Sequence, residues 1–203
     1  MAKSGIRILE SNAQIQKMIE QGLRKDAHKM ISQSISRIKS RITPIIRTAL
    51  STCPEIQSLS GGKLAADFGL TDDPSGQIVS AIVASLNVRP RKGNAREIGG
   101  VIVELQPTSF SNLLGLSSAE QEIDGGSIPW LSWLLTQGDT IILAGYGVEY
   151  GDYGRSGQAR MNRSFAPFKV DSSYSGTAEN NFITRAIDKV SSQIRSAIQG
   201  SMV

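Results

Sequence analysis

Aliphatic side chains recur every three or four positions through the first quarter of the chain. The pattern comprises Ile15, Ile19, Leu23, Ala27, Ile31, Ile35, Ile38, Ile42, Ile45 and Ala49. Because an α-helix has 3.6 residues per turn, this spacing predicts one long amphipathic helix. Ser11 or Asn12 can cap its first turn with a side-chain oxygen. Pro44 lacks an amide hydrogen and predicts a kink or a break, and Pro54 is expected to end the helix.

A second aliphatic stripe lies near the C-terminal end of the sequence. Its members are Ile183, Ile187, Val190, Ile194 and Ile198. The charged residues of the same segment lie off this stripe, so Phe182–Ile198 is predicted to form an amphipathic helix. Each of the two predicted helices needs a partner for its apolar face, either a sheet or a neighbouring subunit.

The chain between these stripes is rich in Gly and predicts short elements separated by loops. Aliphatic and β-branched runs predict four strands, and two shorter segments predict helical turns. The strands are expected at 78–88, 98–106, 140–146 and 159–165, and the helical turns at 63–68 and 128–135. The basic loop Arg89–Arg96 is expected to join the first two strands as a β-hairpin, and the Gly/Tyr-rich loop Tyr146–Gln158 to join the last two.

The order of these elements predicts the α+β class. We expect a long N-terminal amphipathic helix, a small antiparallel β-sheet and a C-terminal amphipathic helix. A chain of 203 residues is long enough to bury one core, so a single domain over 1–203 is expected. Within it, residues 1–54 would form the N-terminal helix region, 55–176 the sheet and loops, and 177–199 the C-terminal helix.

Charge is unevenly distributed along the sequence. The net charge is +4, but residues 1–52 carry +7, residues 53–150 carry −6 and residues 151–203 carry +3. This division is expected if the basic end of one subunit stacks on the acidic middle of another, or if the basic helix faces a polyanion. A basic helix face that only contacts solvent is the third interpretation. Aromatic residues make up only 5% of the chain, so we expect a modest core that neighbouring subunits help to stabilise.

The sequence also limits the cellular compartments in which the protein is expected. Cys53 is the only cysteine, which excludes an intramolecular disulfide and is typical of a reducing compartment. The longest apolar runs, such as 141–144, are far shorter than the roughly 20 residues of a membrane span. The polar N-terminal region predicts no signal peptide, so we expect synthesis in the cytoplasm and no membrane partner.

Residues with catalytic or ligand-binding chemistry form no specific motif. His28 is the only histidine, which excludes a histidine-based metal cluster within one chain, and nothing in the sequence orients it toward Cys53. Gly61-Gly62-Lys63 lacks the earlier Gly and the following Ser or Thr of a phosphate-binding loop. The acidic groups Asp72-Asp73 and Glu120-x-Glu122-x-Asp124 lack the spacing of a calcium loop, and solvated loops are the simpler interpretation. We therefore predict a protein that is not an enzyme, with no catalytic, cofactor-binding or metal-binding residues.

Two loops and one helix face are predicted to contact partners. The basic loop contributes Arg89, Arg91, Lys92 and Arg96, and the Gly/Tyr-rich loop contributes Tyr146, Tyr150, Tyr153 and Arg155. The cations suit either DNA phosphates or an acidic protein neighbour. Tyrosine side chains give a large contact area at a small entropic cost. The exposed face of the N-terminal helix is the third predicted surface.

Several segments resemble neck and tail-completion proteins of tailed-bacteriophage virions. They are Phe68–Asp73 leading into 79–88, Pro129–Asp139 leading into a strand, Gly154–Met161, and Ser175–Asp188. In addition, Ser60-Gly61 with Leu64 and the helix start Phe182/Arg185/Ala186 are similar to the Thr-Gly-x-Leu turn and the Phe-Leu-x-Pro-Ala helix start of small tail-completion proteins. Here the turn has one additional residue, and Arg185 takes the place where that family often has Pro.

The resemblance implies a structural subunit of the virion, in a homo-oligomeric ring of the neck. Such a ring lies between the portal or its adaptor and the tail-terminator or tail-tube proteins, and packaged DNA passes through it without sequence-specific contact. A tail terminator or a tail-tube-associated protein is the alternative within the virion. A small basic DNA-binding protein is the alternative of another class. It would use cations of the long helix: Lys25, Lys29, Arg37, Lys39 and Arg41.

Overall fold

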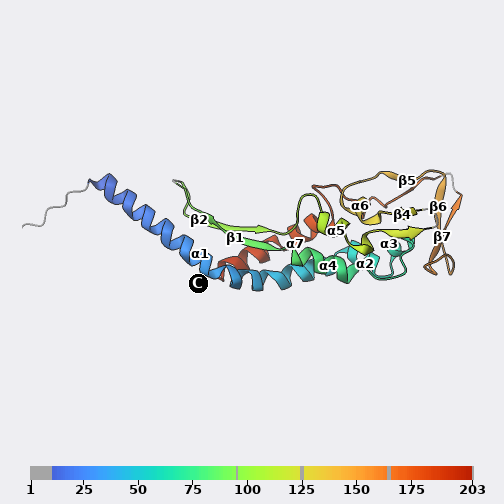
Figure 1. Cartoon of the computed structure of the whole chain (residues 1–203), viewed down its shortest axis with the longest axis horizontal. Coiled ribbons are helices and arrows are strands. Elements are labelled where there is room, and N and C mark those ends of the chain that lie inside the picture. Colours follow the sequence, from blue (N-terminus) through green and yellow to red (C-terminus); the bar gives the residue numbers. More distant parts are fainter. Residues whose placement is uncertain (1–10, 95, 124–125, 164–165, 203) are drawn as a thin grey trace, which may run out of the picture.

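The computed structural model describes residues 11–94, 96–123, 126–163 and 166–202. Figure 1 shows an elongated molecule, in which a long helix and a β-hairpin reach toward one end and the shorter elements gather at the other. The C-terminal helix lies alongside the long helix. These elements confirm the predicted α+β class, with a long N-terminal helix, small antiparallel pairings and a C-terminal helix.

Helix α1 spans Asn12–Ser51 and confirms the predicted N-terminal helix. It begins with a capping box, because the Ser11 hydroxyl accepts from the amide of Gln14 and the Gln14 side chain accepts from the amide of Ser11. Helix α1 ends at Ser51, before Pro54 as predicted, because Cys53, the residue preceding the proline, is extended (φ −72°, ψ 145°), and Pro54 then begins helix α2. A proline in the first turn of a helix loses nothing, since its amide would have no partner there.

Of the kink or break predicted at Pro44, the break does not occur, because α1 runs through this residue without interruption. Ile42 and Ile46, on either side of the proline, are fully buried, and their packing outweighs one missing backbone hydrogen bond. Figure 1 shows a bend in α1 beside the C-terminus of the chain. Arg41 Nη1 donates to the carbonyl of Gly200 at 2.7 Å, which places the C-terminal residues against this part of α1.

The two halves of α1 differ in burial. The buried positions all lie in the second part of the helix: Ile31, Ser34, Ile38, Ile42, Ile46 and Leu50. Helix α7 (Phe182–Gln199) packs along this part, with its aliphatic stripe turned toward the core, as the second stripe predicts. No residue from 12 to 30 is buried. The first half of α1 therefore projects from the packed part of the molecule.

The predicted strand at 78–88 is largely wrong. Residues Ser75–Ala84 form helix α4, and only the end of the predicted segment lies in a strand. The buried residues Ile78, Val79, Ile82 and Val83 repeat with a spacing of four, which is a helical period. The β-branched composition of the segment concealed this period, because Val and Ile favour strands only weakly and packing decides the outcome.

Strands β1 (Asn87–Lys92) and β2 (Gly99–Glu104) form the predicted hairpin, with Asn87 opposite Glu104 and Lys92 opposite Gly99. The segment Arg89–Arg96 is not a loop throughout, because residues 89–92 belong to β1 and extend the pairing. The β1–β2 ribbon lies along α1 and points in the same direction as its projecting half (Figure 1).

Three further two-stranded ribbons lie at the opposite end of the molecule. Strand β3 (Gln121–Ile123) pairs with β4 (Gly126–Ile128), β5 (Ile141–Leu143) with β8 (Phe168–Lys169), and β6 (Tyr146–Tyr150) with β7 (Ala159–Arg163). The predicted pairing of the third strand with the fourth is thus wrong, because a strand inside the Gly/Tyr-rich segment takes that place. Alternation of Tyr146, Val148 and Tyr150 with other residues is a strand period, which the glycines obscured.

Short helices complete the core. They are α2 (Pro54–Leu59), α3 (Lys63–Phe68), α5 (Ser111–Leu114) and α6 (Trp130–Leu135), with a 3₁₀ turn at Ser117–Ala119. Helices α3 and α6 confirm the predicted turns at 63–68 and 128–135. One cluster of buried side chains draws on all of helices α1 to α7. At its centre the Phe68 ring packs against Trp130 and Trp133, with centroids 5.6 and 6.1 Å apart.

Candidate functional site

The predicted basic residues lie on the β1–β2 ribbon, and two of the four have acidic partners. Arg89 donates to both carboxylate oxygens of Glu104, at 2.7 and 3.3 Å, and these bonds hold the pKa of Glu104 below its ordinary value. Arg91 pairs with Glu97 at 2.5 Å. The side chains of Lys92 and Arg96 are exposed and form no ion pair within the described part of the chain. Only these two remain free for a partner.

The residues predicted from the Gly/Tyr-rich segment do not share one loop. Tyr146 and Tyr150 begin and end strand β6, whereas Tyr153 and Arg155 lie in the turn toward β7. The Tyr150 hydroxyl donates to Asp67 of helix α3. Burial raises the pKa of Tyr150, and the neighbouring Asp67 carboxylate raises it further. Tyr150 therefore fastens the β6–β7 ribbon to α3.

One face of the β6–β7 ribbon is polar. Arg160 pairs with Glu149 at 3.1 Å, and its guanidinium lies 4.5 Å from the centre of the Tyr153 ring. The Arg160 hydrogen bond lowers the pKa of Glu149. Arg155, from the same turn, donates to the backbone carbonyl of Glu122 and so ties the ribbon to β3. Tyr153 and Arg155 thus make contacts within the chain itself.

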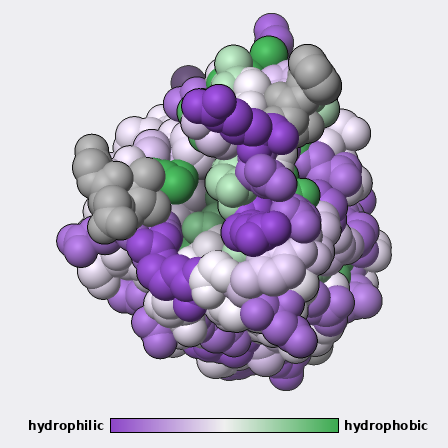
Figure 2. Space-filling model, turned by 90° about the vertical axis from the view of Figure 1, so that its right-hand side faces the viewer, coloured by the Kyte–Doolittle hydropathy of each residue, from purple (hydrophilic) through white to green (hydrophobic). Residues whose placement is uncertain are grey.

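The other face of the ribbon borders a hollow beside helix α3. Val148 and Met161 lie opposite each other in the β6–β7 register and line this hollow together with Phe68 and Ile128. Its volume is about 250 Å³. Figure 2 views the molecule from this end and shows hydrophobic atoms on the floor of a hollow between hydrophilic walls. We call this feature the apolar hollow.

A second hollow brings together acidic residues that lie far apart in the sequence. Asp72, Asp73, Glu120 and Glu122 line a space of about 420 Å³. Burial opposes ionisation of Asp73, but hydrogen bonds from Ser75 and Ser60 outweigh it and lower its pKa. We call this feature the acidic hollow. No cluster able to hold a metal ion is found among the described residues, and Asp124 lies outside them.

The projecting half of α1 and the ribbon turn form a third surface, with exposed apolar side chains. They are Met18, Ile19, Leu23 and Met30 of α1, and Ile98 beside the turn of the ribbon. Leu23 and Ile98 line a common hollow, so helix and ribbon contribute to one surface. We call residues 12–30 together with residues 93, 94 and 96–98 the arm. The exposed fractions of Ile19 and Leu23, 58% and 56%, show that the core of the chain does not cover this stripe.

His28 and Cys53 are held apart. His28 lies within α1 and Cys53 follows its end, and the 23 helical steps from His28 to Ser51 span roughly 35 Å. Burial raises the pKa of the Cys53 thiol to about 11, so the group is protonated near neutral pH. Lys63 of the glycine-containing turn pairs with Asp67 at 2.9 Å. Cys53 and His28 of one chain therefore cannot form a nucleophile–base pair, and Lys63 is not free to bind a phosphate.

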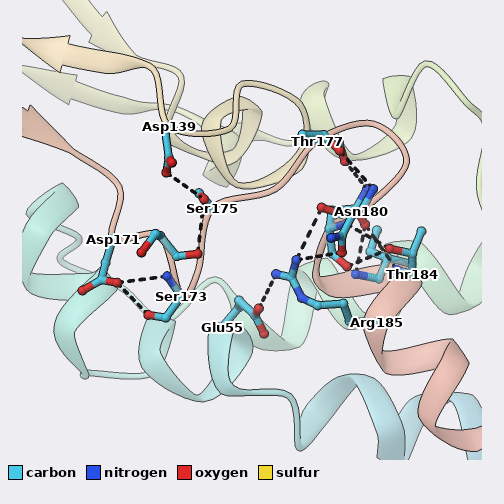
Figure 3. A network of polar contacts seen from close by, with 12 residues as sticks. Glu55, Asp139, Asp171, Ser173, Ser175, Thr177, Asn180, Thr184 and Arg185 are labelled. Atoms are coloured by element: carbon cyan, nitrogen blue, oxygen red, sulfur yellow. Dashed lines mark hydrogen bonds and ion pairs between the residues drawn. The ribbon is translucent and has the colours of Figure 1, made fainter.

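A polar network that sequence analysis missed joins the 171–181 loop to helices α2 and α7 (Figure 3). Glu55 is buried and pairs with Arg185 at 2.6 Å. Asn181 caps α7 by accepting from the amides of Ile183 and Thr184, and the Thr184 hydroxyl accepts from the Asn181 amide. The spacing Asn-x-x-Thr before an apolar run would have revealed the cap. Nothing local in the sequence pairs Glu55 with Arg185.

None of the helices in the described ranges is both long enough and apolar enough to cross a membrane. No family model, curated protein or solved structure matches this chain. The surfaces described above are therefore interpreted from their own geometry and charge.

Proposed function

We propose that this chain is a structural subunit of a tailed-bacteriophage virion. In this proposal it forms a ring in the neck, which joins the portal or its adaptor to the tail and surrounds the DNA channel. The observation that carries the proposal is the uneven distribution of charge, because α1 and the β1–β2 ribbon are basic, whereas the other segments before α7 are acidic. Helix α1 and the β1–β2 ribbon (12–51 and 87–104) have twelve basic and four acidic residues, a net charge of +8. Residues 53–86 and 105–181 have five basic and twelve acidic residues, a net charge of −7.

The segments that resemble neck proteins support the proposal because they pack together. Phe68 contacts Trp130 and Trp133 of the second segment. The amide of Gly138 donates to the carbonyl of Gly176 at 2.8 Å, which links the second segment to the fourth. Gly69 and Gly154 line the same apolar hollow, which links the first to the third. The resemblance is therefore carried by one contiguous region rather than by scattered short matches.

Two of the five cations that the DNA-binding alternative would use form hydrogen bonds within the chain. Arg37 and Arg41 both donate to carbonyls at the C-terminal end of α7, where a positive charge is also favoured by the helix dipole. Lys25, Lys29 and Lys39 remain exposed. Steep salt-dependent binding of duplex DNA by the isolated monomer would favour this alternative over a virion subunit.

The proposal is tested with a phage that encodes this chain. Purified particles should contain the protein, and electron microscopy should place it as a ring between head and tail. A nonsense mutation in its gene should yield DNA-filled heads and separate tails that do not join. Tails of uncontrolled length would favour the tail-terminator alternative, and absence of the chain from particles would overturn the proposal.

Catalysis is tested in the same phage. We expect His28→Ala and Cys53→Ala variants to assemble infectious particles, because His28 lies on the side of α1 away from the apolar stripe of the arm and Cys53 is buried. Loss of infectivity with normal levels of folded protein would favour an enzymatic role instead.

A further inference from the structure

The arm presents an apolar surface that nothing in its own subunit covers. Ile19 and Leu23 lie one turn apart on α1, and Ile98 extends the surface onto the ribbon turn with an exposed fraction of 59%. On a helix of 3.6 residues per turn, Lys25 and Lys29 lie beside Met18 at one margin of this stripe, and Asp26 lies between Lys29 and Ile19. Both lysines are exposed. The arm is thus an apolar stripe with a basic margin.

The opposite end of the molecule presents the complementary arrangement. The apolar hollow and the acidic hollow adjoin, because Gly69 lines the first and Thr71 the second. Arg155 lines the apolar hollow, and it donates to the carbonyl of Glu122, which lines the acidic one. The apolar hollow with the acidic hollow beside it is therefore complementary, in polarity and in charge, to the apolar stripe of the arm and its basic margin.

We propose that the arm of one chain docks into the apolar hollow of a second copy, with Lys25 and Lys29 facing its acidic hollow. The inference rests on the proposed assembly role and names the two surfaces that such a subunit uses. The arm and the hollows lie at opposite ends of the chain, so an arm cannot reach the hollow of its own subunit (Figure 1, Figure 2). The contact is therefore heterologous, the type of interface that closes into a ring when successive rotations add up to a full turn.

A second copy explains this surface better than DNA does. Phosphates would be met by Lys25 and Lys29, but they give no reason for exposed Met18, Ile19 and Leu23 in the same stripe. Each copy carries both surfaces, so the chain alone supplies an occupant of matching charge and polarity. Desolvation of the apolar stripe drives the contact, and the acidic hollow selects the orientation of the arm.

The test uses full-length chains and sedimentation analysis. The arm variant is Ile19→Glu with Leu23→Glu, and the hollow variant is Met161→Glu, whose parent side chain is 40% exposed. Matched controls add the same number of Glu side chains at exposed positions outside the arm and the apolar hollow: Ser36→Glu with Ser40→Glu, which are also four residues apart on α1, and Gln158→Glu in the turn before β7. All four proteins should give the wild-type circular dichroism spectrum, because the replaced side chains are not part of the core.

We expect the wild-type chain and both controls to self-associate, and the arm and hollow variants each to associate at least tenfold more weakly. The decisive sample is an equimolar mixture of the two defective variants. One intact arm and one intact hollow remain in that mixture, so it should form dimers that grow no further. A hollow variant that associates by itself would show arm-to-arm contact and overturn the inference. So would a mixture without dimers, or a wild-type chain that stays monomeric up to about 1 mM, the dissociation constant of a very weak contact.

This outcome is separable from that of the proposed function. Monomeric behaviour would overturn the head-to-tail contact while the protein could still be found in phage particles. Absence from particles would overturn the virion role while the mixed-variant dimer could still form.

Discussion

The arginines and lysines of this chain differ in whether they pair with another group of the same chain. Most arginines of the described ranges have an acidic or carbonyl partner, as Arg89, Arg91 and Arg185 do. Among the described lysines, only Lys63 forms an ion pair. The planar guanidinium group can hold two acceptors at once, whereas an ammonium group on a flexible stem gains less from a fixed partner. Partner contact through charge is therefore expected mainly from the lysines of α1 and from Lys92.

The Glu55–Arg185 pair gives the first prediction. Arg185→Ala should lower the free energy of unfolding by about 2 to 3 kcal/mol, because it leaves the buried Glu55 carboxylate without its partner. The loss falls below that of a fully buried pair, since one third of the Arg185 side chain is exposed. The control is Arg89→Ala, which breaks a fully exposed Arg–Glu pair and should have a much smaller effect in urea unfolding. Equal losses in the two variants would contradict this account.

The turn between β6 and β7 gives the second prediction. Gly154 and Gly157 both have a positive φ, of 78° and 68°, but a Cβ at Gly154 would overlap the carbonyl of Ala159, whereas one at Gly157 meets open space. Gly157→Ala should therefore cost about 1 kcal/mol of strain, and Gly154→Ala about 3 kcal/mol. Guanidinium unfolding of the two variants measures the difference, and the prediction fails if Gly157→Ala is the more damaging change.

At the scale of elements, periodicity predicted more than composition did. The two long helices followed from stripes of aliphatic residues, and burial of one face specified them strongly. Composition misled where it was used alone: β-branched residues concealed helix α4, and glycines concealed strand β6. The pairing of β5 with β8 depends on contacts across 25 residues, which a local pattern does not contain.

The start of helix α4 gives the third prediction. Asp73 accepts from the amide of Ser75 at 2.8 Å and from the hydroxyl of Ser60 at 2.7 Å. Asp73→Ala should therefore destabilise the protein by about 1 kcal/mol at pH 7. The folded-state pKa of Asp73 is lowered from 3.8, so its contribution is present above pH 3.8 and is lost as the pH falls through the lower folded value.

The pH dependence separates this contribution from a general loss of packing. The difference between wild type and Asp73→Ala should shrink below pH 3.8 in thermal unfolding. Asp72→Ala is the matched control, since Asp72 accepts only one long bond, from Thr71 at 3.4 Å, among the described residues. A difference that is constant with pH would show that the charge of Asp73 contributes nothing.

At the scale of the whole molecule, the distribution of charge along the sequence indicated a basic and an acidic region. The shape of the surfaces in these regions was not predictable. The split between a basic first quarter and an acidic middle was visible, and the basic β1–β2 ribbon then joins α1 in space. The two hollows were not predictable, because each combines residues from segments about 50 to 90 positions apart. Five of the predicted contact residues have partners within the same chain: Arg89, Arg91, Tyr150, Tyr153 and Arg155. Their use in partner contact stays a prediction.

The elongated shape gives the fourth prediction. A compact chain of 203 residues has a radius of gyration of about 17 Å, whereas α1 alone is about 60 Å long. X-ray scattering of the arm variant, which should remain monomeric, is expected to give a radius clearly above 17 Å. A value near 17 Å would show that the first half of α1 folds back onto the rest of the molecule.

The grip of Arg37 and Arg41 on the carbonyls of residues 200 and 201 has a mechanical consequence. The arm meets the rest of the molecule beside this grip, and α7 runs from there to the Glu55–Arg185 pair at its other end. These contacts join both ends of α7 to the α1–α2 segment, so α7 forms a second connection between the arm and α2, beside the second half of α1. A force applied to the arm would therefore be shared by two adjacent helices, and no pair of strands would have to separate.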